Sequence, residues 1–113
     1  MDPRAVLKQA EARLPQLPER QISEASQKEY RRVVARMEKA GDFDPMASTR
    51  SRDTYHLRRS AFHWVFRERL AKAISGLERL IRARRVRESR TAAAELLGLI
   101  ARIDAVLADH PAI

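Results

Sequence analysis

An apolar pattern with helical spacing runs from residue 55 to residue 81, and it favours an α-helical fold for the middle of the chain. Its main stripe consists of Tyr55, Phe62, Phe66, Ala73, Leu77 and Leu80. At about 100° per residue, Leu57 and Trp64 fall on nearly the opposite side of the same helix. A helix that is apolar on two sides is either buried between other helices of the domain or presents one apolar side to a partner. We expect burial between layers, with Trp64 against the first or the last helix.

The length of this helix suggests a break within it. A continuous helix over 51–85 would measure about 50 Å, which exceeds the expected diameter of a 113-residue domain. Ser75-Gly76 offers a natural break, because Ser75 and Glu78 have the spacing of a capping box. The sequence therefore predicts two helices, near 51–74 and 76–86.

The N-terminal part of the chain predicts a short helix followed by a stiff connector. Asp2 followed by Pro3 is a favourable helix start. Pro15 and Pro18 end this helix, because proline lacks an amide donor and restricts the residue before it. We expect a stiff connector over residues 15–22 and a first helix that is short enough to be a loosely docked arm.

A second helix is predicted to begin at Ser23 or Ser26, since Ser26 and Glu29 form a capping-box pattern. Gly41 is a natural C-terminal stop for it. Ser48 or Ser51 is expected to cap the central helix. The loop between these helices is expected to place two apolar side chains in the core, Phe43 and Met46.

The last helix is predicted over residues 89–109, with one apolar stripe. This stripe consists of Ala93, Leu96, Leu97, Ile100, Ile103 and Leu107. The fold class is therefore all-α, a small bundle of four to five helices. We expect one domain over 1–113, made of an N-terminal arm (1–21), a helical core (22–87) and a C-terminal helix (88–113).

Positive charge is concentrated in the stretch from Arg50 to Arg90. This stretch carries thirteen Lys or Arg against four acids, whereas the remaining residues carry ten bases and eleven acids. The whole net charge of +8 therefore resides here, and it indicates a polyanionic partner, with nucleic acid first and an anionic membrane surface second. Two interpretations without a binding role stay open: the basic face can be merely solvated, or some arginines can pair with neighbouring glutamates.

Residues with catalytic or ligand-binding patterns are sparse. The chain has no Cys, which excludes disulfides, thiolate catalysis and Cys-type zinc sites, and its three Gly argue against a Gly-rich phosphate loop. His56 and His63 stand seven residues apart without further ligands at metal-binding spacing. We therefore expect no enzyme, cofactor, metal or small-molecule substrate. Residues 1–20 carry too many charges for a signal peptide, so we expect a cytoplasmic protein, nucleoid-associated if it binds DNA.

The basic stretch supplies the candidate DNA contacts. Arginine suits bidentate contact with phosphate and guanine, and a helix start also favours phosphate. The candidate DNA-binding residues are Arg50, Arg52, Arg58, Arg59, Arg67, Arg84, Arg85 and Arg87. We favour the front half of the stretch, Arg50 to Arg59, as the DNA-facing end.

Two helix openings carry a family resemblance over residues 22–75. Ser23-x-x-Ser26-x-x-x-Tyr30, followed by Val33, Val34 and Met37, resembles the opening of the core-binding domain of tyrosine recombinases, the phage integrases. The later pattern is similar to the family's following helix, and it consists of Thr49, Thr54, Tyr55, Arg58 and Ala61. The resemblance implies a SAM-like helical bundle that grips duplex DNA opposite a separate catalytic domain.

The catalytic parts of that family are missing from this sequence. The catalytic Arg, the His-x-x-Arg motif and the nucleophilic Tyr have no counterpart, and Tyr30 and Tyr55 are read as core or core-edge residues. The last helix also lacks the usual Asn-Pro exit. We therefore expect a domain that binds without cleaving DNA, either excised from a larger recombinase or standing alone.

A protein-interaction module is the alternative from a different class. The two-sided apolar character around Leu57 and Trp64, with the stripe of the last helix, could form a homo-oligomer. A basic peripheral membrane protein ranks lowest, because the arginines are spread over several helices instead of lining one amphipathic helix.

Overall fold

The structure, a computed structural model, describes residues 1–41 and 51–111. These residues form four α-helices and, after the first, a short 3₁₀ turn, and none of them forms a β-strand. The elements are α1 (Pro3–Arg13), η1 (Leu14–Gln16), α2 (Glu24–Ala40), α3 (Arg52–Arg82) and α4 (Val86–Asp109). The predicted all-α class is confirmed.

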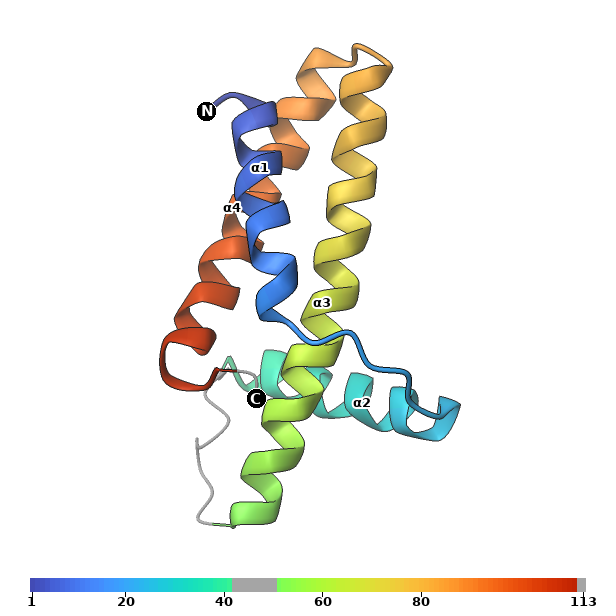
Figure 1. Cartoon of the computed structure of the whole chain (residues 1–113), viewed down its shortest axis with the longest axis vertical. Helices are drawn as coiled ribbons and strands as arrows, with labels where there is room; N and C mark the ends of the chain where they lie inside the picture. Colours follow the sequence, from blue (N-terminus) through green and yellow to red (C-terminus); the bar gives the residue numbers. More distant parts are fainter. Residues whose placement is uncertain (42–50, 112–113) are drawn as a thin grey trace.

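Helix α3 is the longest helix and extends along almost the whole molecule (Figure 1). Its 31 residues correspond to about 46 Å of helix, in a molecule whose principal extents are 48 × 26 × 25 Å. Helix α4 returns antiparallel along α3, and α1 packs against both of them. Helix α2 crosses the N-terminal half of α3, and among the described helices it contacts α3 alone. The fold is therefore an elongated three-helix sheaf with one crossing helix.

The predicted break at Ser75-Gly76 is wrong. Helix α3 continues through both residues to Arg82, so 51–74 and 76–86 are not separate helices. A rounded domain of 113 residues would be too narrow for a helix of this length, but this molecule is elongated and about as long as its longest helix. Helix α4 consequently begins at Val86, three residues before its predicted start.

The glycine inside α3 offers a direct test of this continuity. A Cβ added at Gly76 would meet no atom within 4 Å, and the backbone there is helical. Gly76→Ala is therefore expected to raise the free energy of unfolding by about 0.5–1 kcal/mol, as in other helix interiors. Urea denaturation measures this change. Gly41→Ala should instead destabilise, since Gly41 ends α2 with a φ of 68°; stabilisation at both positions would contradict the structure.

Three side-chain caps fix where the helices begin. Asp2 caps α1 by accepting from the Arg4 amide at 3.2 Å. Ser23 caps α2, and Ser51 caps α3. The predicted Ser26–Glu29 capping box is wrong, because Ser26 lies in the first turn and donates its amide to Ser23 Oγ. Three predictions about the fold concern residues 42–50, outside the described part of the chain: those for Phe43, Met46 and Ser48.

The core runs the length of the α1–α3–α4 sheaf. Phe62 and Phe66 are both buried and stack at 4.0 Å between ring centroids. From α1, Val6 and Ala10 have no exposed surface, and Leu17 of the connector is buried as well. The prediction of a loosely docked arm is therefore wrong, because α1 fills the groove between α3 and α4.

Trp64 packs against α2 instead of the first or last helix. Its Nε1 donates to the Arg20 carbonyl oxygen at 3.2 Å, and its ring lies 6.3 Å from that of Tyr30. The Arg31 guanidinium stands 5.3 Å from the Trp64 ring centroid. The prediction that this side of α3 is covered within the fold is correct, but the covering element is α2 with the connector that precedes it.

A buried histidine ties the end of α4 to α3. His63 is 4 % exposed, and its Nε2 donates to the His110 carbonyl oxygen at 2.9 Å. The Tyr55 hydroxyl also contacts Nδ1 of His110 at 3.1 Å. Burial lowers the pKa of His63 and outweighs the bond to His110, which raises it; Arg59 lowers it further. The neutral imidazole is therefore the form that fits the fold.

Acidification is expected to destabilise the domain through His63. Its pKa in the folded state lies below the unfolded value of about 6.5, so the unfolded chain binds the extra proton first. The free energy of unfolding should fall as the pH drops from 7 through 6.5 toward the folded pKa. Urea denaturation at several pH values measures this loss, and His63→Gln should flatten the curve over that range. Equal pH dependence in both proteins would contradict the assignment.

Candidate nucleic-acid interface

The structure divides the predicted site residues between the two ends of α3. Arg52, Arg58 and Arg59 lie in its first two turns, whereas Arg84 and its neighbours lie beyond its C-terminus. Arg58 and Arg82 are separated by about 36 Å of helix. A single contiguous basic face over the whole stretch is therefore absent from the described residues.

The front group is small and partly engaged with its own helix. Arg52 donates from Nε to Nε2 of His56 at 3.4 Å, and the Arg59 guanidinium lies 5.5 Å from the Tyr55 ring centroid. Arg58 is half-buried. Arg50 falls outside the described residues.

Arg67 has a structural role at the centre of the molecule. Its Nη1 donates to the carbonyl oxygens of Leu14 and Leu17, at 2.7 and 2.6 Å, and Nη2 lies 3.6 Å from a carboxylate oxygen of Glu19. These bonds hold the connector against α3. The guanidinium is thus occupied by groups of the same chain, and we leave Arg67 out of the interface.

Other basic side chains along the sheaf are paired with acids from distant parts of the sequence. Arg13 forms an ion pair with Asp104 at 3.0 Å, and Arg69 with Glu38 at 2.6 Å. Glu68 accepts from Arg31 and Lys72, both at 3.2 Å. Burial alone would raise the pKa of Glu68, but these two partners outweigh it and lower the pKa. The charges of Arg13, Arg31, Arg69 and Lys72 are therefore compensated by acids of the same chain.

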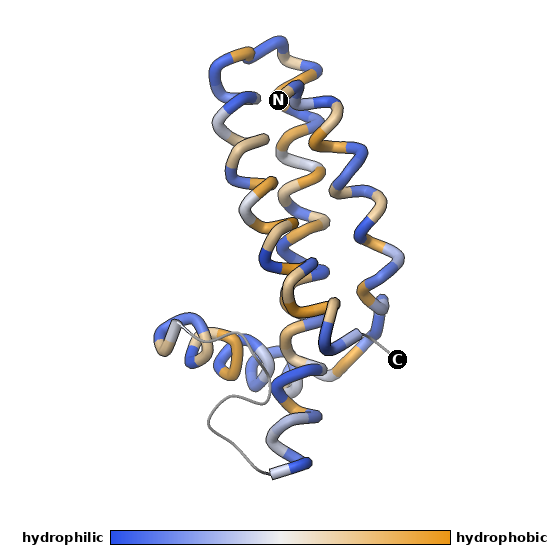
Figure 2. Tube along the Cα trace, turned by 90° about the vertical axis from the view of Figure 1, so that its left-hand side faces the viewer, coloured by the Kyte–Doolittle hydropathy of each residue, from blue (hydrophilic) through white to orange (hydrophobic). Residues whose placement is uncertain are grey.

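The opposite end of α3 presents a different arrangement, which we name the arginine end. It consists of Arg79, Arg82, Arg84, Arg85, Arg87 and Arg90, all of which are exposed. Against these six arginines, residues 78–90 contain two glutamates, a net charge of +4. Figure 2 shows this end as a mainly hydrophilic turn, with hydrophobic positions recurring along the helices below it.

The side chains of five of the six arginines make no ion pair or hydrogen bond to any residue that the structure describes. Arg85 is the exception, because its Nη2 contacts Glu88 at 3.1 Å. The pKa of Glu88 is lowered first by a hydrogen bond from its own amide and second by Arg85. That carboxylate therefore sits against the start of α4, and the other five guanidiniums remain solvated: Arg79, Arg82, Arg84, Arg87 and Arg90.

A tight helix-to-helix turn brings these arginines together. The Arg85 amide donates to the Leu80 carbonyl at 3.1 Å and the Arg84 amide to the Ile81 carbonyl at 3.0 Å. This is the Schellman pattern, and Arg84 occupies its left-handed position with a φ of 58°. Glycine is the usual residue there, because a side chain in this conformation costs about 1 kcal/mol or more. Arg84 therefore holds a strained backbone conformation at this turn.

Sequence reasoning missed part of this cluster. Arg79, Arg82 and Arg90 belong to the predicted basic stretch but were not among the candidate contacts, and Arg4 was not considered. Arg4 lines a pocket with Arg84 and Arg90, because α1 begins beside the α3–α4 turn. Nothing in the local sequence signals that proximity, which depends on how α1 packs.

The fold and this surface define a small all-α domain of four helices with an arginine-rich end. Compared with protein-family models, with curated proteins and with solved structures, the chain matches none of them. The part of the chain that the structure describes contains no helix with the length and apolarity to cross a membrane. Those residues also contain no cluster of three or more side chains suited to hold a metal ion.

Proposed function

We propose that this chain is a non-catalytic helical domain that binds duplex DNA by gripping its phosphate backbone with the arginine end. The observation that carries the proposal is the group of five exposed guanidiniums, without partners among the described residues, around one tight turn. Like charges held together repel one another, and a polyanion relieves that repulsion while releasing its own counterions.

Two further features support phosphate as the ligand. Arginine presents a planar fork of donors that matches phosphate oxygens, and all six basic residues of this end are arginines. The first turn of α4 lies within the cluster, and the positive end of a helix dipole adds to its field. Charge and donor geometry therefore favour the same kind of partner.

A narrower assignment forms part of the proposal: a SAM-like relative of the core-binding domain of tyrosine recombinases. Its support is the pair of helix openings that resemble that family, in which Ser23 and Ser51 act as N-caps. Within this proposal the chain acts in the cytoplasm, at the nucleoid, and contributes binding without strand cleavage. Recombinase activity would require a partner that supplies the missing catalytic residues.

Fluorescence anisotropy of a labelled duplex at several salt concentrations tests the DNA-binding function. Engagement of about five phosphates should give a slope of log K against log salt near −4 to −5. Undetectable binding at low salt, or binding that ignores salt, would reject the proposal.

Arg84→Gly should separate stability from binding. Removal of the side chain at a φ of 58° is expected to raise the free energy of unfolding by about 0.5–1 kcal/mol. Loss of one phosphate contact should weaken duplex binding about eightfold at about 0.1 M salt, since each contact contributes about 0.9 to the salt slope. Arg84→Lys, which keeps the charge and the strain, is the matched control. Weaker folding or unchanged binding in Arg84→Gly would count against this role.

The interaction-module alternative lacks a supporting surface in the described residues. Trp64 and the stripe of α4 are packed within the chain. Among those residues, the large apolar side chains that are exposed are Met1 and Val86, and two side chains are too few to form a docking face. No specific observation therefore favours this second function.

A further inference from the structure

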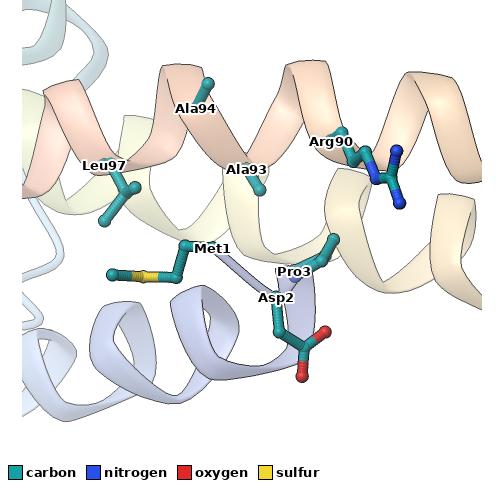
Figure 3. A pocket seen from close by; sticks show the side chains of 7 residues that line it. All are labelled: Met1, Asp2, Pro3, Arg90, Ala93, Ala94 and Leu97. Atoms are coloured by element: carbon teal, nitrogen blue, oxygen red, sulfur yellow. The ribbon is translucent and has the colours of Figure 1, made fainter.

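A pocket of about 430 Å³ lies between the start of α1, the end of α3 and the start of α4. Arginines from three different segments line it: Arg4 from α1, Arg84 from the turn and Arg90 from α4. An adjoining pocket of about 540 Å³ shares Arg90 with it, and Figure 3 shows this side chain extending from α4 past Pro3. Three arginines from separate segments of the chain therefore line one hollow at the arginine end.

A buried hydroxyl also lines the pocket. Ser89 is 5 % exposed, and its Oγ has no hydrogen-bond partner among the residues that the structure describes. Ser89 opens the inward-facing stripe of α4, which continues as Ala93 and Leu96. A hydrophobic residue would be expected at such a position, because a buried hydroxyl without a partner is destabilising. An acceptor in the pocket would satisfy it.

The first turn of α4 adds unbonded donors. Its N-cap residue, Arg85, makes no side-chain capping bond. Amides at an uncapped helix start point outward and favour an anion, and the helix dipole acts in the same direction.

Asp2 is the one acid that lines the pocket, and its carboxylate serves as the N-cap of α1. Asp2 accepts from the Arg4 amide at 3.2 Å and so caps α1. In Figure 3 its carboxylate points away from α4, while the Arg90 guanidinium extends along the other side of Pro3. Asp2 therefore leaves the three guanidiniums available to a ligand.

We propose that this pocket holds one phosphate group, with Arg84 and Arg90 contacting its oxygens and Ser89 Oγ donating to it. The inference rests on the proposed function, because the phosphate we assign is one of the backbone phosphates of the bound duplex. A free phosphate shares this chemistry. Within this proposal, the Ser89 hydroxyl fixes the position of the arginine end along the DNA backbone. Because this hydroxyl carries no charge, its contribution does not depend on counterion release.

Ser89→Ala tests this inference in the duplex-binding assay. Loss of a hydrogen bond to a charged group should weaken binding roughly tenfold, with the salt slope unchanged, because no charge is removed. Thr91→Ala is the matched control, since its hydroxyl bonds to the Arg87 carbonyl outside the pocket. Thr91→Ala should bind like the original protein, and Ser89→Ala should unfold at the same or higher urea concentration.

Inorganic phosphate, compared with chloride at equal ionic strength, distinguishes the source. Backbone amide shifts at Ser89 and Arg90 should respond to phosphate in the original protein and not in Ser89→Ala. If duplex binding is present but Ser89→Ala does not weaken it, the inference is overturned while the proposed function stands. If the duplex does not bind but phosphate shifts these amides, the proposed function fails and the pocket takes free phosphate. If the duplex does not bind and phosphate does not shift these amides, both the proposed function and this inference are overturned.

Discussion

Replacement of Arg79, Arg82, Arg87 and Arg90 by Gln is expected to weaken duplex binding more than about a thousandfold at about 0.1 M salt. Each of these exposed guanidiniums lacks a partner among the described residues and is free to contact one phosphate. Each lost contact removes about 0.9 from the salt slope, or about eightfold in affinity at that salt concentration. The slope should therefore fall by about 3.6 in the same titration.

The matched control removes the same charge from another exposed surface. Helix α2 offers four exposed basic residues, Lys28, Arg32, Arg36 and Lys39. Their joint replacement by Gln lowers the net charge of the protein equally but leaves the arginine end intact. Binding should change less than about tenfold, through the weaker overall field alone. If both variants lose affinity equally, the net charge of the protein accounts for binding and the arginine end has no special role.

Arg67→Ala is expected to lower the free energy of unfolding by about 2–4 kcal/mol, the largest stability effect we expect for an arginine here. The substitution removes two hydrogen bonds from a charged donor to the Leu14 and Leu17 carbonyls and leaves those acceptors unsatisfied. The Arg67 side chain is 24 % exposed, which limits the loss to this range. Urea denaturation measures it.

Two companion substitutions show whether geometry or charge is responsible. Arg67→Lys keeps the charge but cannot reproduce the guanidinium fork, so it should recover less than half of the loss. Arg36→Ala, at an exposed position of α2, should stay within about 0.5 kcal/mol of the original protein. Full stability in Arg67→Ala together with weakened DNA binding would return Arg67 to the interface that its sequence position suggested.

Much of the fold follows from local sequence signals. Asp2, Ser23, Ser51 and Gly41 were predicted as helix boundaries, and each has that role. These assignments succeed because a cap depends on residues within one turn of it. The apolar stripe of α4 was also correct, with Ala93, Leu96, Ile100 and Ile103 buried.

The predictions that failed depended on how helices meet. The break at Ser75-Gly76 was inferred from an assumed molecular diameter, and only the packing of α1 and α4 along α3 reveals an elongated shape. Trp64 was assigned to the wrong neighbour because helical periodicity identifies a buried side but not its covering element.

For the candidate site, the sequence showed where the arginines are concentrated, but not which of their side chains are bonded to other residues of the chain. Arg67 and Arg69 look equivalent to Arg79 in the sequence, yet they bond to partners more than 25 residues away, such as Leu17 and Glu38. A solvated arginine can be told from a structural one only when those distant acceptors are placed. The front half of the basic stretch was preferred because it carries part of the family resemblance, whereas the rear half has charge without a motif. The unpartnered side chains at the rear, among the described residues, are the reason why we propose the arginine end instead.

The most direct test of the arginine end is an amide chemical-shift titration of the ¹⁵N-labelled protein with a short duplex. We expect the largest shifts over residues 79–90 and at Arg4, with small changes at Arg52, Arg58 and Arg59. Shifts concentrated at the start of α3, or no saturable shifts at low salt, would contradict the proposal that the arginine end binds DNA.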